Sequence, residues 1–592
     1  MRIPFNHSSW VIWAVAIVSL SVFLSFAHWD TQSIIKSDAK GYSAYLASWF
    51  IYQDARFDFY ETLDWEEAQR YWVNKHPNGE RFPKYTMGIA MLQVPAYLTA
   101  HVLAPVFGFE SDGWSVPYHL AIGLNGIMML IIGLIFTRKW LLRYYERRVV
   151  DWSILILFFS TNLFFQGVLD TAMAHIYSFA MVAGMLYAYD HWRFTKQAGW
   201  LFAAAAFFGF VLVIRPSNGL VILIPVISFF ANRDYKFIKP IQLLLAAIIA
   251  FIPLLPQLAH WHYMTGDWFY YSYEDEKIFW LNSHWIEGLI SWRNGWLIYT
   301  PAVIVAILGL IIAIRKYKVM STAVLAMLLV NTYVVFAWWC WYYGNSFSMR
   351  PMVDFYPALA FGFAAAVSWT WRGSTLAKSL LIGFIGLATI HNLILTKHYH
   401  NQILSGSAMT KRSFVEASFT WKPNRNMDLA GWFKHPDTDR LRLGIPERTL
   451  HDTIIEKTWK KTEVGEVSNA NPYSKSFKVA ATDFESTEDR IINVRSEFEG
   501  SDFDDADIFL VMSIDSEQRN HLYQTLNLRK VCDASLGHQT VNAYFEKPRD
   551  LPEDAKLKVF FWLSRGKGSI DVKHIAVRQL NCPWSEPLEL IE

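Results

Sequence analysis

Cysteine is scarce in this chain, and its three copies form no metal-binding pattern. Cys340 ends an apolar run, whereas Cys532 and Cys582 lie in the polar C-terminal part. Their spacing matches neither a structural zinc site nor a dense disulfide framework. A single disulfide between Cys532 and Cys582 is left open, because the sequence does not give the distance between them.

An excess of one charge is also lacking. The formal net charge is +2, with 54 basic and 52 acidic residues. Proteins that bind nucleic acid usually carry a broad basic surface, so nucleic acid is not expected as a partner. Arg2 precedes an apolar stretch over 10–27 that shows no small-residue cleavage site followed by a soluble chain. This arrangement predicts an uncleaved first membrane span.

Long apolar runs are confined to the first two thirds of the chain. Hydrophobic residues make up 53% of the sequence, but no run from Tyr399 onward approaches membrane length. The pattern predicts an α-helical polytopic membrane protein of about eleven spans over 1–398. The predicted spans are 10–28, 115–137, 151–167, 172–190, 199–214, 217–231, 240–259, 297–314, 319–338, 354–371 and 377–396.

Basic residues gather in alternate links between these spans. The basic links are 138–148, 193–196, 233–239, 315–318 and 372–378. Lysine and arginine favour the cytoplasmic side, which places the N-terminus inside and the C-terminal part outside. The orientation requires that the apolar segment 87–106, which contains two prolines, lies at the interface and does not cross. Residues 29–114 then form one large external loop.

Period-two alternation replaces helical spacing in the C-terminal part. Leu557, Val559, Phe561 and Leu563 alternate with other residues, and further short strands are predicted between 475 and 577. The segment 466–592 is therefore predicted to be an all-β sandwich or jelly roll outside the membrane. Residues 399–465 are interpreted as a linker.

Ionisable residues at the outer membrane face are the candidates for chemistry. Asp38 and Lys84, with Tyr85 beside it, lie at the two ends of the first external loop, and Arg215 and Arg350 lie in later external links. A carboxylate can take a proton from an acceptor hydroxyl. Lysine and arginine can hold a lipid phosphate, arginine by paired hydrogen bonds.

The order of these motifs resembles bacterial members of the C-type (GT-C) glycosyltransferase superfamily, and is similar to the protein O-mannosyltransferase and lipid A aminoarabinose transferase families. The resemblance covers roughly residues 10–400. Its motifs are the acidic group at Asp38, Lys84 before the interfacial helix, Arg215-Pro216-Ser217-Asn218, the stretch Gly295–Pro301, and Gly344…Ser346…Arg350.

The resemblance implies that a sugar moves, with inversion, from a polyprenyl-phosphate or diphosphate donor to an extracytoplasmic protein, lipid or glycan. Asp38 would be the catalytic base or would orient the acceptor. Lys84 would contact the carrier phosphate, and Arg215 and Arg350 would be additional phosphate ligands. The expected location is the bacterial inner membrane, with the C-terminal domain in the periplasm. No cofactor is expected, although a divalent metal is left open.

Alternative interpretations remain for several of these features. His175 is interpreted either as a cavity-lining group that contacts substrate, as Tyr85 is expected to do, or as a helix-packing residue. His76 and the acidic run at 274–276 match no metal motif. The whole chain could instead be a lipid-linked glycan transporter, which should show internal repeats. It could also be a non-catalytic scaffold that displays the β domain.

Overall fold

The protein folds into two units, which we describe from a computed structural model. Unit 1 comprises Met1–Thr396 and unit 2 comprises Lys397–Glu592. The structure describes residues 10–273, 276–281, 283–344 and 346–401 of the helical part. Beyond these it describes 403, 404, 406, 409, 411–421, 454–484, 491–501, 506–516, 520–528, 537–546, 551–566 and 568–581. Cys532 and Cys582 lie outside the described residues.

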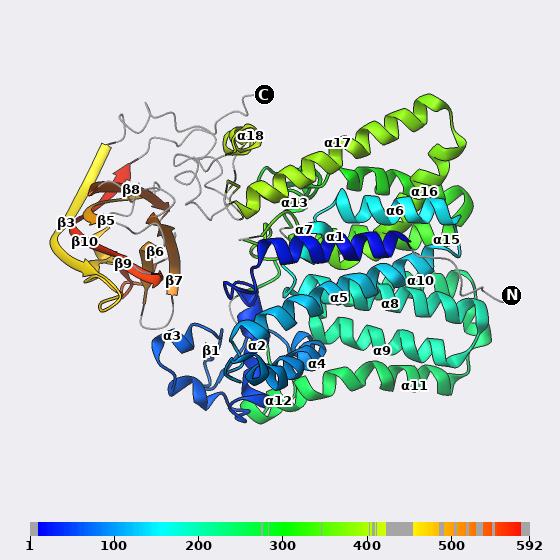
Figure 1. Ribbon diagram of the computed structural model, residues 1–592, viewed down its shortest axis with the longest axis horizontal. Coiled ribbons are helices and arrows are strands. Elements are labelled where there is room, and N and C mark those ends of the chain that lie inside the picture. The colour runs from blue at the N-terminus through cyan, green and yellow to red at the C-terminus, as the bar shows by residue number, and fades with distance from the viewer. Residues whose placement is uncertain are drawn as a thin grey trace. The chain divides into compact units, whose positions relative to one another are not determined.

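Unit 1 is helical, as the apolar runs predict. Its first half holds α1 (Trp10–Phe26), α2 (Asp38–Phe50), α3 (Trp65–Ala68), α4 (Gly88–Leu103), α5 (Val116–Leu141), α6 (Arg147–Phe159), α7 (Leu163–Val168) and α8 (Ala174–Thr195). Its second half holds α9 (Ala198–Ile214), α10 (Leu223–Ala231), α11 (Pro240–Phe251), α12 (Leu255–Thr265), α13 (Trp285–Ile290), α14 (Trp296–Tyr299), α15 (Ala302–Phe336), α16 (Tyr356–Arg372) and α17 (Thr375–His400). Figure 1 shows α5, α8, α9 and α11 side by side.

Several of these helices can cross a membrane. Among the described residues, five are long and apolar enough by length and composition, and four apolar helices are shorter, α4 among them. The predicted span 297–314 begins in α14 and continues in α15, and the predicted span 319–338 ends two residues beyond α15. Both therefore lie mainly in this one helix, which is interrupted by non-helical backbone at Tyr317. The basic link 315–318 coincides with this interruption. The structure therefore supports a multi-pass membrane protein, while the number of about eleven spans stays a prediction.

Small residues let the helices approach closely. A Cβ atom at Gly309 of α15 would overlap the carbonyl oxygen of Gly362 on α16, and one at Gly362 would overlap that of Ala306. Such contacts are typical of helix pairs in membranes, where packing replaces the hydrophobic effect as the main attraction. The α15–α16 pair therefore positions η6 (Arg350–Phe355), the 3-10 turn that leads directly into α16.

Residues 29–114 form a compact layer at one end of the helices (Figure 1). Besides α2, α3 and α4, this layer holds the hairpin of β1 (Asn74–Lys75) and β2 (Arg81–Phe82), and η1 (Asp58–Glu61). Aromatic side chains make up its core, with the Tyr52 and Phe59 rings stacked at 4.0 Å between centroids. This aromatic packing holds α2 and the chain around Lys84 in fixed positions.

Unit 2 contains a β-sandwich, as the alternation predicts. One antiparallel sheet has the order β3-β10-β5-β8 and the other β4-β9-β6-β7. The strands are β3 (Ile454–Val467), β4 (Phe477–Ala480), β5 (Ile491–Ser501), β6 (Asp507–Asp515), β7 (Asn520–Asn527), β8 (His538–Glu546), β9 (Lys556–Arg565) and β10 (Ser569–Asn581). Apolar side chains from both sheets form one core.

The strand β3 begins at Ile454, inside the segment 399–465 that the sequence analysis assigns to a linker. β3 is an edge strand paired only with β10 in its sheet, and it carries three lysine residues and three glutamate residues among its fourteen positions. Charged residues are common on edge strands because they oppose pairing with other chains. The charged residues that make β3 resemble a linker in the sequence are therefore explained by its position at the edge of the sheet.

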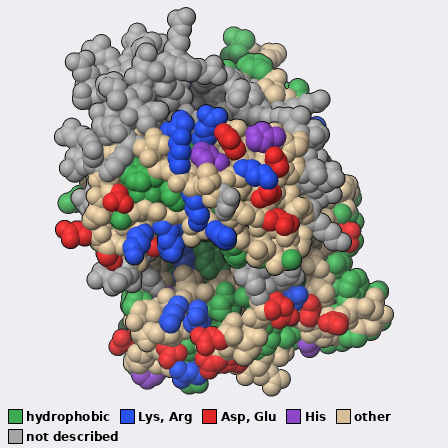
Figure 2. Space-filling view, turned by 90° about the vertical axis from the view of Figure 1, so that its left-hand side faces the viewer, with side chains coloured by type: hydrophobic (Ala, Val, Ile, Leu, Met, Phe, Trp, Pro, Cys, Tyr) green, Lys and Arg blue, Asp and Glu red, His purple; other side chains and the backbone are tan. Residues whose placement is uncertain are grey.

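Among the side chains coloured in Figure 2, basic and acidic groups are intermixed.

Candidate active site

Asp38 is the first residue of α2, and two groups from distant parts of the chain hold its carboxylate. The Tyr85 hydroxyl donates a hydrogen bond to Oδ1 at 3.0 Å. Arg350 Nη2 lies 3.4 Å from Oδ2. Ser37, just before Asp38, has a φ of 48°, an unusual value for a residue with a side chain. Strained backbone of this kind is often found where a functional group must be held in one place.

The charges around Asp38 keep it ionised. Burial raises the pKa of the carboxyl, but Arg350, the hydrogen bond from Tyr85 and the charges of Lys84 and His175 outweigh this effect. The pKa of Asp38 therefore lies below its ordinary value. Burial and the Asp38 charge raise the pKa of Tyr85, so its hydroxyl stays protonated and remains a donor. The site thus presents a carboxylate, not a carboxylic acid, at neutral pH.

Lys84 lies beside this pair in a pocket of aromatic rings. Its ammonium nitrogen is 5.2 Å from the Trp72 ring centroid and 5.5 Å from those of Tyr85 and Tyr273. The same nitrogen donates to Glu276 Oε1 at 2.6 Å. Cation–π contacts and a carboxylate together fix the position of the ammonium group. Lys84 is therefore a partly buried cation with one internal anionic partner.

A second carboxylate orders Arg215. Asp354 is fully buried and accepts a hydrogen bond from Asn218 at 2.6 Å. His175 Nδ1 lies 2.8 Å from the other oxygen of Asp354, and Arg215 Nη1 lies 3.9 Å from the carboxylate and 3.1 Å from the His175 ring. This cluster, which we call the Asp354 cluster, holds the guanidinium by a buried network.

The structure brings the sequence candidates into one region. Asp38 contacts Tyr85 and Arg350 directly, and Lys84 acts on the pKa of Asp38. Arg350 and Asp354 both belong to η6, which joins the two clusters. Burial and the Asp38 charge raise the pKa of the Tyr42 hydroxyl on the next turn of α2, while Arg215 and Arg350 oppose this rise. Asp38 is thus closer than 4 Å to one candidate cation and under the electrostatic influence of another.

Sequence reasoning missed the partners of the cations. In the sequence, Glu276 is noticeable only as part of an acidic run that matches no metal motif, and Asp354 is marked only by following Arg350 by one helical turn. The only sequence signal for Asp354 is that spacing. Asn218 belongs to the Arg-Pro-Ser-Asn motif, and its amide is what connects that motif to Asp354.

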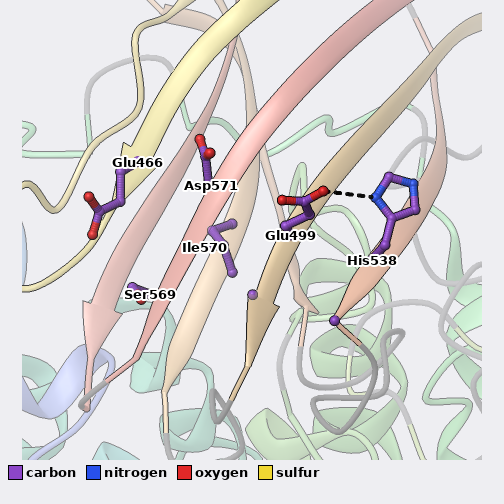
Figure 3. Close-up of a pocket in the computed structure, with 8 residues that line it drawn as sticks. Glu466, Glu499, His538, Ser569, Ile570 and Asp571 are labelled. Carbon is purple, nitrogen blue, oxygen red and sulfur yellow. Dashed lines mark ion pairs between the residues drawn. The ribbon is translucent and has the colours of Figure 1, made fainter.

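Acidic residues also gather on unit 2, around a hollow lined by Glu466, Glu499 and Asp571 (Figure 3). His538 lies 3.8 Å from Glu499, and Lys573 lies 2.6 Å from Asp571 and 3.2 Å from Glu499. Lys573 is thus a shared basic partner of Asp571 and Glu499. Among the residues that the structure describes, no group of three potential ligands could hold a metal ion.

Comparison with known proteins gives structural neighbours only. No protein-family profile matches the chain, and no curated protein matches it in sequence. The oligosaccharyltransferase AglB from the archaeon Archaeoglobus fulgidus, in complex with an inhibitory peptide and a dolichol-phosphate, aligns at 12% identity and a TM-score of 0.38. The alignment covers 70% of this chain and 56% of that one.

Two further solved structures align at a similar level. The apo form of the Archaeoglobus fulgidus oligosaccharyltransferase aligns at 11% identity and a TM-score of 0.34, over 70% of this chain and 56% of that one. The arabinosyltransferase EmbB from Mycobacterium smegmatis aligns at 11% identity and a TM-score of 0.33, over 98% of this chain and 66% of that one. The chain thus spans little more than half the length of the oligosaccharyltransferases. Likeness at this level does not establish function, which has to be argued from the site.

Replacing Asp354 with asparagine tests the Asp354 cluster. The change keeps the shape but removes the charge opposite Arg215 and His175. We expect Asp354→Asn to lower the free energy of unfolding by about 3 kcal/mol, measured by chemical unfolding in mixed micelles. The control is Glu80→Gln, which breaks the more exposed pair with Arg56 and should cost less than about 1 kcal/mol. Equal losses in both variants would contradict the assigned role.

Proposed function

We propose that this protein is a membrane glycosyltransferase that moves a sugar from a polyprenyl-phosphate or diphosphate donor to an acceptor outside the cytoplasm. The observation that carries the proposal is the contact between ionised Asp38 and Arg350, with Lys84 close by. A base and several phosphate-binding cations are the groups that such a transfer requires. Helices long enough to cross a membrane would give a lipid-linked donor lateral access.

The cations suit the leaving phosphate. Arg350 contacts Asp38 through Nη2, while its Nε is buried and has no hydrogen-bond partner among the described residues. An unsatisfied donor in a buried guanidinium is costly, and a phosphate oxygen would satisfy it. Lys84 can add a point charge, and Arg215 can add a further pair of donors. Neutralising the leaving group is the larger electrostatic task in this reaction.

The proposed step is a single displacement. The acceptor hydroxyl gives its proton to an Asp38 carboxylate oxygen as its own oxygen forms a bond to the anomeric carbon of the sugar. The bond between that carbon and the carrier phosphate breaks, and the electron pair leaves with the phosphate, which the cations stabilise. The configuration at the anomeric carbon inverts. No cofactor takes part in the proposed step.

The substitution Asp38→Asn distinguishes an enzyme from a transporter or a scaffold. Asp38→Asn keeps the side-chain volume but removes the base, and we expect turnover to fall by about 10²- to 10⁴-fold. Cells that lack the gene are supplied with the parent protein or with Asp38→Asn at equal protein level. Their glycoconjugates are then compared by mass spectrometry. The control, Asp30→Asn, changes an exposed residue of the same segment and should restore the missing linkage. Restoration of the linkage by Asp38→Asn would exclude Asp38 as the catalytic base.

Glu276 should compete with the donor phosphate for Lys84. The two groups are 2.6 Å apart, so an incoming phosphate has to take over a cation that already has an anionic partner. We expect Glu276→Gln to lower the KM for the donor roughly two- to tenfold, because the neutral amide binds the ammonium more weakly. The matched control is Glu61→Gln, which removes the partner of Arg81 in the same layer and should leave KM unchanged. A higher KM in Glu276→Gln would mean that Glu276 positions Lys84 instead.

A further inference from the structure

A pocket of about 350 Å³ lies beside the first turn of α2. It is lined by Ser37 and Lys40 from that turn, and by Tyr60, Gln69, Tyr71 and Trp72 from the segment that leads to β1. Its volume falls in the usual range for small-molecule sites, about 300–1,000 Å³. None of these six residues is one of the cations that bind the donor phosphate in the proposed function.

The aromatic walls of this pocket are held in place from behind. The buried Tyr71 ring packs edge-on against Phe59 at 5.8 Å and against Trp114 at 6.2 Å. The Arg81 guanidinium lies 5.7 Å from the centroid of the Tyr60 ring. Rings fixed in this way lose little conformational freedom when a ligand stacks on them, which favours binding. The pocket is therefore largely formed before any ligand arrives.

The pocket adjoins the segment that carries the proposed base. Ser37 precedes Asp38 directly in the chain, and Lys40 follows it by two positions. Trp72 packs edge-on against Tyr85, the hydrogen-bond donor to Asp38, with 5.9 Å between ring centroids. Trp72 also lies under Lys84, and it is 38% exposed. Trp72 therefore connects the pocket both to the hydrogen-bond donor of the base and to the phosphate-binding cation.

The lining favours an amphipathic ring as the ligand. Three aromatic side chains line the pocket together with polar residues, and the Lys40 ammonium donates to the backbone carbonyl oxygen of Gln69 at 2.5 Å. A pyranose has apolar C–H faces that stack on aromatic rings and hydroxyl edges that need polar partners. A lipid chain would leave the polar groups unsatisfied.

We propose that this pocket binds the acceptor and that the acceptor is a carbohydrate, whose hydroxyl is presented to Asp38. The identification of the ligand as the acceptor rests on the proposed function. Saccharide binding to the pocket does not depend on turnover. Of the three acceptor classes that the sequence leaves open, the pocket thus selects glycans over proteins and lipids.

The test is saccharide binding to the full chain in lipid nanodiscs. The probes are methyl pyranosides, neutral and uronic, and short serine- and threonine-containing peptides, with affinity measured by saturation-transfer NMR. We expect at least one pyranoside to bind, and Tyr60→Leu to weaken it roughly three- to tenfold. The matched control is Tyr263→Leu, which removes an exposed tyrosine that lies under Arg56 at 5.9 Å, outside the pocket. It should bind as the parent does.

Gln69→Ala provides a second variant in case Tyr60→Leu fails to fold, because Gln69 is exposed and its backbone carbonyl is kept. This variant should also weaken pyranoside binding. The proposal is overturned if no pyranoside binds, if binding ignores both variants, or if only peptides bind. Asp38→Asn should still bind the pyranoside. Binding without any transferase activity would refute the proposed function alone, whereas activity without pyranoside binding would refute this inference alone.

Discussion

The candidate site depends on one partly buried carboxylate, whose cost of burial is offset by neighbouring cations and a hydrogen-bond donor. Asp38 is ionised although its side chain is only 20% exposed, and this is possible because Arg350, Tyr85 and Lys84 offset the cost of burial. These partners come from segments far apart in the sequence. The aromatic layer of residues 29–114 fixes α2 and Lys84, while the close α15–α16 contact fixes η6.

Each of the three cations has its own carboxylate: Arg350 has Asp38, Lys84 has Glu276 and Arg215 has Asp354. These three pairs are therefore electrically balanced within themselves. In the proposed reaction, a donor phosphate would exchange partners with these groups, so its binding energy would reflect the difference between two sets of ion pairs. Such an exchange would release Asp38 from Arg350 when the base is needed.

The sequence could predict what depends on local pattern and not what depends on tertiary contact. Apolar runs located the helices, alternation located strands such as β9, and charges at span ends located Asp38, Lys84 and Arg350. Glu276 reaches Lys84 from 192 positions away, and Trp72 reaches it through the tertiary folding of residues 29–114, so no spacing marks either residue. The edge strand β3 was missed because its charges resemble a linker, and the break at Tyr317 carries no proline signal.

Infrared difference spectroscopy between the parent and Asp38→Asn tests the central claim most directly, because it reports whether this one carboxyl carries a proton. Titration toward acid should show a protonated-carboxyl band for Asp38 only below the pH range in which an ordinary aspartate takes up its proton, since the pKa of Asp38 is lowered by Arg350, Tyr85 and Lys84. A carboxyl band present at pH 6 in the parent and missing in Asp38→Asn would contradict the account, because a neutral Asp38 could neither pair with Arg350 nor accept a proton.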